Sequence, residues 1–340
     1  MSITVLKPGM LSTFQDEGRY GYQHQGIPVA GAMDERAHQL ANLLAGNNTQ
    51  VATLEITLTG PTLRFDSAAC FAVAGADLGA TLDGKPLALN RPLIARPGAI
   101  LAFGAPALGA RAYLAVYGGF ALEPVMESGS TYLRSGFGGW HGRALRKDDR
   151  IGLARPLRAE PEVLDPLAQA LWDTRIYLPA TLRTFARDTL RVLPGPHWDE
   201  FSDRARSAFL AQPFRISAQS DRMGYRLQGP PLLMDRPRQI LSEATCFGTI
   251  QVPAGGEAIV LMADRQTTGG YPKLAQVASV DLPALAQRLP GEEVRFSMIE
   301  LEQAQALDSA RARAFDELHA RLQALRDPLL QSIALKEART

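Results

Sequence analysis

The chain has 340 residues, and its 46% hydrophobic content is enough for the cores of two domains. Its 36 basic and 35 acidic residues leave a formal net charge of +1, so nothing indicates a nucleic-acid or membrane partner. No apolar run approaches the roughly 20 residues that span a bilayer, and MSITVLKPGM lacks the pattern of a signal peptide. Cys70 and Cys246 stand far apart, without metal-ligand spacing. We therefore expect a cytoplasmic protein with no structural metal.

Glycine and proline punctuate most of the chain, with 30 and 23 residues respectively. This pattern favours many short strands joined by turns, and thus a mainly β protein. In chain order, we expect a helix from Asp34 to Gly46, strands at 70–75, 111–119, 248–252 and 258–262, a short helix from Asp281 through Leu289, and a C-terminal amphipathic helix with Phe315, Leu318, Leu322 and Leu325 on one face.

Three short segments recur in the same order, although with different spacings. VLKPG at Val5 returns as VLPG at Val192, LTGPTL at Leu58 as LQGPPL at Leu227, and PGAILAF at Pro97 as PGEEVRF at Pro290. Either a β domain has been duplicated, or similar Pro-Gly turns recur by chance. The Pro-rich stretch 154–166 predicts the start of a linker. The expected organisation is a β domain over 1–155, a linker over 156–190, a second β domain over 191–300 and a helical tail over 301–340.

Polar groups gather beside glycine in three segments, at 16–34, 220–229 and 263–273. The third, ADRQTTGGYPK, directly follows the apolar strand 258–262. Glycine-rich backbone lets N–H groups approach an anion, and the Thr, Gln, Arg and Lys side chains add donors and charge. This composition suits a carboxylate, carbamate or phosphate. The alternative is that Gly269-Gly270 forms a hairpin turn with solvated polar neighbours, and that Asp221 and Arg222 form a surface turn.

Several motifs of well-known enzymes are missing. We find no GxxxxGK[ST] phosphate loop, no biotin-attachment sequence and no GxSxG elbow. His24 and His38 are candidate general bases, although a lone histidine is more often a surface or packing residue. If ATP or biotin takes part in the chemistry, this chain binds it through an unusual surface or meets it on a partner.

Five motifs together resemble one family: GIPVAGAMD (26–34), LEITLTGPTLRF (54–65), VLPGPHWDEF (192–201), SDRMGYRLQG (220–229) and ADRQTTGGYPKLAQV (263–277). This is the allophanate hydrolase subunit 2 family, also called biotin-dependent carboxyltransferase, which in bacteria includes the C subunit of 5-oxoprolinase. The resemblance covers about residues 2–296. It implies two cyclophilin-like β-barrel domains with a few short helices.

The resemblance also implies a function within a hetero-oligomer. Such a protein takes part in the ATP-dependent conversion of 5-oxoproline to L-glutamate, a lactam hydrolysis. Its expected partners are a subunit-1-type protein (the B subunit of 5-oxoprolinase), the ring-opening A subunit of 5-oxoprolinase and a small amide-bearing substrate. ATP, with Mg²⁺, belongs to the assembled complex, and no biotin is attached to this chain. The alternatives are a carboxyltransferase subunit of urea or allophanate metabolism, and a non-catalytic regulatory protein that antagonises a kinase inhibitor.

The matching motifs carry the candidate site residues. We assign anion binding to Arg222, Arg265 and Lys273, amide recognition to Gln266, and hydroxyl donation to Thr267 and Thr268. Asp264 is the candidate proton-transfer group, because an acid at the end of an apolar strand can have a raised pKa; the alternative is a structural partner for a nearby cation. The remaining candidates are Tyr225, Gly269, Gly270 and Tyr271, with His24, Asp34 and Asp221 as additional ones. We expect 220–226 and 263–273 to meet in one cleft.

Overall fold

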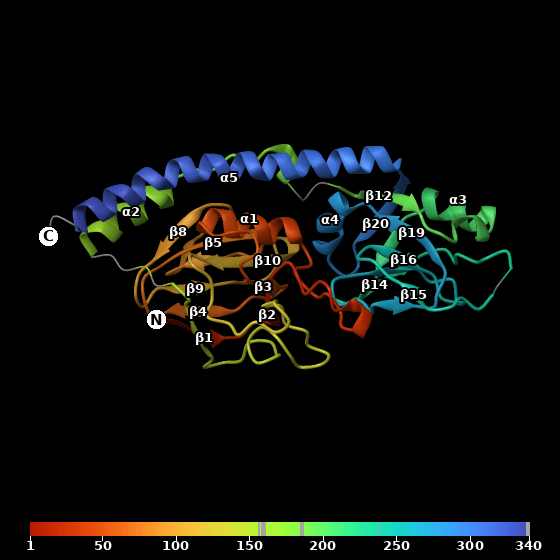
Figure 1. The fold of residues 1–340 in the computed structure, drawn as a ribbon, viewed down its shortest axis with the longest axis horizontal. Coiled ribbons are helices and arrows are strands. Elements are labelled where there is room, and N and C mark those ends of the chain that lie inside the picture. Colours follow the sequence, from red (N-terminus) through yellow and green to blue (C-terminus); the bar gives the residue numbers. More distant parts are fainter. Residues whose placement is uncertain (156, 158–160, 184–186, 237, 338–340) are drawn as a thin grey trace. The chain divides into compact units, whose positions relative to one another are not determined.

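The computed structural model describes residues 1–155, 157, 161–183, 187–236 and 238–337. The chain divides into two compact units (Figure 1). Unit 1 comprises Met1–Glu17, Glu35–Arg183 and Arg311–Thr340, and unit 2 comprises Gly18–Asp34 and Thr184–Ala310. Segment 18–34, which we expected within the N-terminal domain, thus groups with unit 2. The two units are described separately below.

Unit 1 holds two antiparallel sheets. Its elements are β1 (Ser2–Lys7), β2 (Leu11–Gln15), α1 (Glu35–Ala45), β3 (Thr53–Thr57), β4 (Thr62–Phe65), β5 (Ala69–Asp77), β6 (Thr81–Leu82), β7 (Lys85–Pro86), β8 (Pro92–Ala95), β9 (Ile100–Ala102), β10 (Leu108–Val116), β11 (Arg150–Gly152) and α2 (Pro161–Asp173). The strand orders are β11-β1-β4-β9-β6-β7 and β2-β3-β10-β5-β8.

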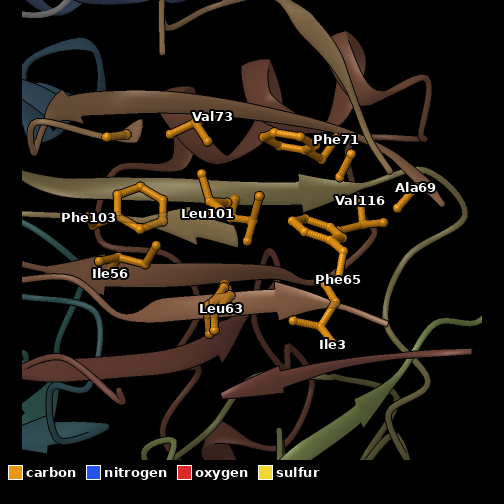
Figure 2. Packing of buried hydrophobic residues seen from close by; sticks show 14 of the residues in the cluster. Ile3, Ile56, Leu63, Phe65, Ala69, Phe71, Val73, Leu101, Phe103 and Val116 are labelled. Carbon is orange, nitrogen blue, oxygen red and sulfur yellow. The ribbon is translucent and has the colours of Figure 1, made fainter. Parts of the chain in front are cut away.

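The main core of unit 1 is built from side chains of both sheets. Figure 2 shows Phe65, Phe71 and Leu101 in this cluster, and each of them is fully buried. The rings of Phe65 and Phe71 lie 5.3 Å apart between centroids. Helix α1 packs on β5 and β10, which explains why both strands are apolar along most of their length rather than alternating.

Part of the expected linker is a helix that packs on unit 1. In α2, Leu164, Leu167 and Leu171 follow an i, i+3, i+7 pattern, and Leu164 is buried with Ala68 and Ile94. The prolines of this stretch suggested a linker, but Pro161 occupies the first helical position, where a missing N–H costs nothing. The apolar stripe was the stronger signal.

Unit 2 contains a closed barrel. Its elements are β12 (Thr189–Pro194), α3 (Asp203–Ala211), β13 (Phe214–Ile216), β14 (Gly224–Gln228), β15 (Glu243–Ala244), β16 (Thr249–Gln251), β17 (Ile259–Leu261), β18 (Thr268–Gly269), β19 (Lys273–Val277), α4 (Leu282–Ala286) and β20 (Glu293–Met298). The barrel order is β12-β19-β16-β17-β14-β13-β20, closed by parallel pairing of β12 with β20. The expected mainly β class is confirmed, with one closed barrel in the described chain.

Segment 18–34 contributes to the core of unit 2. The Met33 side chain is fully buried in the same cluster as Val260 and Leu274 of the barrel. Asp34 is also fully buried and accepts a hydrogen bond from Gln287 Nε2 at 2.7 Å. The barrel is therefore completed by residues that lie far upstream in the sequence.

The expected helices are present, with corrected ends. Helix α4 ends at Ala286 rather than near Leu289. Asp281 stands at its N-cap position, but its carboxylate does not cap the helix; it binds the Arg191 guanidinium at 2.6 and 2.8 Å and the Arg191 amide at 2.8 Å. The C-terminal helix α5 (Leu301–Glu337) has Phe315 and Leu318 buried. Across the described residues, we find no helix with the length and apolar character needed to cross a lipid bilayer.

Candidate functional site

The polar segment 263–273 begins where β17 leaves the barrel core. Met262 and Ala263 are fully buried and anchor the end of the strand. The next residue, Asp264, forms a two-point ion pair with Arg222, at 3.0 Å to Nε and 2.9 Å to Nη2. The Asp264 amide also donates to the Arg222 carbonyl at 2.8 Å. Segments 220–226 and 263–273 therefore meet, through both side chain and backbone.

Arg222 also holds segment 18–34. Its Nη2 donates to the Gly31 carbonyl at 2.6 Å, and the side chains of Arg222 and Asp264 are only 5% and 6% exposed. A buried guanidinium with these partners joins three segments of unit 2. We expected Arg222 to bind an anion from the substrate, but the anion bound to it in the structure is Asp264. Its proposed role in substrate binding stays a prediction.

Asp264 has different surroundings from those assumed for a proton-transfer group. The expected raised pKa required a carboxylate among apolar neighbours. The structure instead places a guanidinium against both carboxylate oxygens. This matches the alternative of a structural partner for a nearby cation, and proton transfer by Asp264 stays a prediction.

Lys273 is also paired with an acid. Its side chain is 8% exposed, and Nζ donates to Glu243 Oε2 at 2.8 Å and to the Ala244 carbonyl at 2.9 Å. The Lys273 ammonium lowers the pKa of the Glu243 carboxyl. This pair joins β19 to the short strand β15.

Arg265 is the exception among the three candidate cations. It is partly buried, its Nη1 lies 3.5 Å from the Met262 carbonyl, and its guanidinium carbon lies 5.8 Å from the centroid of the Phe247 ring. Among the described residues, no carboxylate lies within ion-pair distance of Arg265. Burial lowers the pKa of Arg265, and Tyr20, Cys246 and Asp264 partly offset this effect. A guanidinium in these surroundings can accept an anionic ligand without breaking a salt bridge.

The Thr-Gly stretch forms a small ribbon rather than an open loop. Strand β18 pairs with β15, with Glu243 opposite Gly269 and Ala244 opposite Thr268. The Thr245 amide donates to the Thr267 carbonyl at 3.0 Å, and its hydroxyl donates to the Gln266 carbonyl. The side chains of Gln266 and Thr268 are exposed, as is half of Tyr271.

The two glycines of this ribbon have close protein neighbours. A Cβ at Gly269 would lie 2.4 Å from Gln251 Nε2, and one at Gly270 would lie 3.3 Å from the Ile240 carbonyl oxygen. Neither residue has a positive φ. We expected these glycines to open space for a ligand, but the closest group at Gly269 is a glutamine side chain.

The remaining candidates lie in other local environments. Tyr225 is buried, with its hydroxyl 3.4 Å from the Ala286 carbonyl. Asp221 accepts from the amides of Met223 and Gly224 at 2.8 and 3.1 Å, so it stabilises a turn. His24 lies in an exposed 3-10 turn. These three residues, like the buried Asp34, belong to segments of unit 2 other than the ribbon.

The sequence analysis missed Gln251 and Phe247. Each lies against the ribbon or the Arg265 beside it, but in sequence they are the last residue of a short apolar strand and a residue of a loop. The one available signal was an amide in the otherwise apolar GTIQV.

Cations and acidic side chains are the groups that would hold Mg-ATP. Two of the three candidate cations are already paired with carboxylates. No group of three or more His, Cys, Asp or Glu residues in the described ranges is arranged to hold a metal ion. We therefore assign no step on this chain to ATP.

Known proteins match most of this chain. Residues 25–298 match the family model described as "Carboxyltransferase domain, subdomain A and B". The chain is 39% identical over 320 residues to the 5-oxoprolinase C subunit of Escherichia coli, covering 94% of this chain and 98% of that protein. It is 38% identical to the 5-oxoprolinase C subunit of Haemophilus influenzae, covering 90% and 94% respectively.

Solved structures show the same fold in larger proteins. The K. lactis urea amidolyase superposes with a TM-score of 0.84 at 30% identity, covering 93% of this chain but only 20% of the amidolyase. TTHA0988 superposes with a TM-score of 0.72 at 34% identity, covering 87% of this chain and 55% of its own. This chain therefore spans about a fifth of the amidolyase and just over half of TTHA0988.

Proposed function

Because this chain belongs to the carboxyltransferase-domain family with subdomains A and B, we propose that it is the C subunit of an ATP-dependent 5-oxoprolinase. The observation that supports this most directly is the end-to-end match to the Escherichia coli 5-oxoprolinase C subunit, at 94% and 98% coverage. In contrast, the urea amidolyase match covers only 18% of that relative. The expected family resemblance is confirmed.

We propose that the enzyme converts 5-oxoproline to L-glutamate and that this chain supplies part of the substrate site. Its partners in the proposal are a subunit-1-type protein, which is the B subunit, and the ring-opening A subunit of 5-oxoprolinase, in the cytoplasm. ATP and Mg²⁺ are bound by the assembled complex. In this proposal, unit 1 and unit 2 are both variants of a cyclophilin-like fold.

The ribbon and its surroundings support this chemistry. 5-Oxoproline has a carboxylate and a lactam, so it needs a cation and groups that recognise an amide. Arg265 is a cation without an acidic partner among the described residues. We propose that it binds the substrate carboxylate, with the exposed Gln266 and Thr268 and the partly exposed Thr267 as polar neighbours. Negative charge that develops on the lactam oxygen is stabilised by such positioned donors.

We propose that the ion-paired residues Arg222, Asp264 and Lys273 hold the site together rather than bind the substrate. Arg222 and Asp264 hold segments 18–34, 220–226 and 263–273 in one arrangement, and Lys273 holds the ribbon through Glu243. Gly269, Gly270 and Tyr271 shape the ribbon, whereas Tyr225 packs in the barrel core. His24, Asp34 and Asp221 are retained as supporting residues of unit 2.

A carboxyltransferase subunit of urea or allophanate metabolism is the second candidate. The TM-score of 0.84 with the K. lactis urea amidolyase favours it. Carboxybiotin and allophanate both carry a carboxylate, so the Arg265 guanidinium suits this candidate as well, and the share of each relative that the chain covers separates the two candidates.

Reconstitution distinguishes the two candidates. The chain is mixed with the other two 5-oxoprolinase proteins of the same organism, with ATP and 5-oxoproline, and glutamate formation is measured. We expect glutamate only when all three proteins are present. Transfer of the carboxyl group from added carboxybiotin to urea, and no glutamate, would support the second candidate instead.

A further inference from the structure

Gln251 is a buried glutamine whose side chain makes no hydrogen bond with any described residue. It is the last residue of β16, it is 5% exposed, and its Nε2 is buried without an acceptor. A buried polar group without a partner normally costs stability, so native structures contain few of them. Either the Gln251 amide has a function other than folding, or it destabilises the barrel without any benefit.

A second glutamine of the same barrel gives the appropriate comparison. Gln276, on β19, donates from Nε2 to the Phe247 carbonyl at 2.7 Å and accepts from the Thr249 hydroxyl at 2.8 Å. Its amide is therefore part of the barrel's internal bonding, and that of Gln251 is not.

The free amide of Gln251 lies against the ribbon that carries the candidate site. The nearest heavy atom to a Cβ built at Gly269 is Gln251 Nε2, at 2.4 Å, and Thr245 Cγ2 is also close, at 3.3 Å. Gln251 also stands opposite Lys273 in the β16–β19 register. Any larger residue at position 269 would displace the amide, so the glycine is needed for Gln251 to occupy this place.

A primary carboxamide is chemically complementary to a lactam. Each presents one C=O and one N–H side by side on the same edge, so the two groups can form a pair of hydrogen bonds. Because no described residue accepts a hydrogen bond from Gln251 Nε2, the amide can turn toward a ligand without losing one. Gln266, the glutamine that we assigned from the sequence, is exposed to water and lacks this pre-formed position.

We propose that Gln251 recognises the lactam amide of the substrate, and that Gly269 is the positioning residue that gives its side chain room. This inference rests on the proposed function, because it takes 5-oxoproline as the substrate. It assigns amide recognition to a residue that lies outside the five family motifs. It also means that Gly269 leaves space for the Gln251 side chain rather than for the ligand.

The first test separates recognition from folding. Gln251→Met keeps the side-chain length and removes the amide. We expect kcat/KM for 5-oxoproline in the three-protein complex to fall about tenfold or more, while the melting temperature of the purified chain stays equal or rises. Gln276→Met is the matched control, in which the melting temperature falls because bonded groups lose their partners. Gln266→Ala, measured in parallel, should reduce kcat/KM less than Gln251→Met does.

The second test examines whether Gly269 acts through Gln251. Gly269→Ala should reduce kcat/KM in the wild-type background but have little further effect in the Gln251→Met background, because the amide is already absent. Gly255→Ala is the control, since nothing lies within 4 Å of a Cβ there and its φ is ordinary. It should change neither value.

The outcomes are distinguishable. If the wild-type complex makes no glutamate, the proposed function fails and this inference fails with it. If the wild type is active and Gln251→Met has unchanged kcat/KM, only the inference is overturned. A Gln251→Met chain that is less active and also melts at a lower temperature shows that the amide supports folding, and this result overturns the inference too.

Discussion

At the scale of single residues, the chain keeps several charges away from water, and their partners decide their roles. The Arg222–Asp264 pair has both side chains nearly inaccessible, whereas the Arg215–Glu293 pair is 60% and 53% exposed. A buried ion pair that loses one member leaves an uncompensated charge, while an exposed pair contributes little. Removing the arginine should therefore destabilise the protein strongly in the buried pair and only slightly in the exposed pair.

Arg222→Ala should lower the free energy of unfolding of unit 2 by about 3–5 kcal/mol, because the buried Asp264 loses the guanidinium that bonds both of its carboxylate oxygens. Arg215→Ala, the control, should cost less than about 1 kcal/mol. Chemical denaturation of both variants, followed by a probe in unit 2, provides the measurement. Equal effects in the two variants would contradict the structural role of Arg222.

His38 makes the stability of unit 1 depend on pH. The ring is fully buried and bonded to the Thr53 hydroxyl through Nδ1 at 2.8 Å. Burial lowers its pKa to about 4, while Asp16, the backbone at Thr49 and Glu55 act in the opposite direction. His38 therefore binds a proton near pH 6.5 in the unfolded chain, but only near pH 4 in the folded chain. The stabilisation is full above pH 6.5 and is lost as the pH falls toward 4.

The expected size of this loss is about 3 kcal/mol. Stability curves between pH 7 and 4 should show it as a difference between the wild type and His38→Gln, which does not titrate. Parallel curves for the two proteins would mean that His38 does not control this pH range.

Arg265 should control recognition of the substrate carboxylate. Arg265→Gln removes the charge, and a charge-assisted hydrogen bond of roughly 1.5–3 kcal/mol corresponds to a ten- to hundredfold rise in KM for 5-oxoproline. Arg226→Gln, on the exposed side of β14, serves as the control and should leave KM unchanged. Thr268→Ala should have a smaller effect than Arg265→Gln, because a neutral hydroxyl bond contributes roughly 1 kcal/mol.

At the scale of elements, segment 18–34 matters because it belongs to the barrel unit, although strand β2 and helix α1, which flank it in sequence, belong to unit 1. Met33 fills the barrel core, and Arg222 binds Gly31. The segment is therefore part of the structure that holds the ribbon, and its integrity should be coupled to the site.

Met33→Ala should destabilise unit 2 by about 2–5 kcal/mol, through lost contacts and the cavity that remains. Met10→Ala is the control, because Met10 is 67% exposed and should change little. Thermal melting with a reporter in each unit tests the assignment: a loss confined to unit 1 would show that segment 18–34 does not stabilise unit 2.

At the scale of the whole molecule, the proposed function makes the chain one component of a larger enzyme. It covers nearly the full length of its 5-oxoprolinase relatives, each of which is named as one subunit of an enzyme. The purified chain alone should therefore show little ATP hydrolysis with 5-oxoproline, and activity should appear when the partner proteins are added. Full turnover by the isolated chain, measured as phosphate and glutamate release, would contradict this prediction.

The sequence by itself determined the mainly β class, the strands at 70–75 and 258–262, and the family. These conclusions depend on local features, namely apolar runs, turn residues and contiguous motifs, which are visible without knowing the partners of any residue. The sequence did not reveal helix α2 within the expected linker, because proline marks a helix start as readily as a linker. Only the tertiary structure decided the partners. It placed segment 18–34 in unit 2, paired Arg222 with Asp264 and Lys273 with Glu243, and set Gln251 against Gly269. Each contact joins residues far apart in sequence, and charge pairing and side-chain packing at such distances leave no periodic signal along the chain.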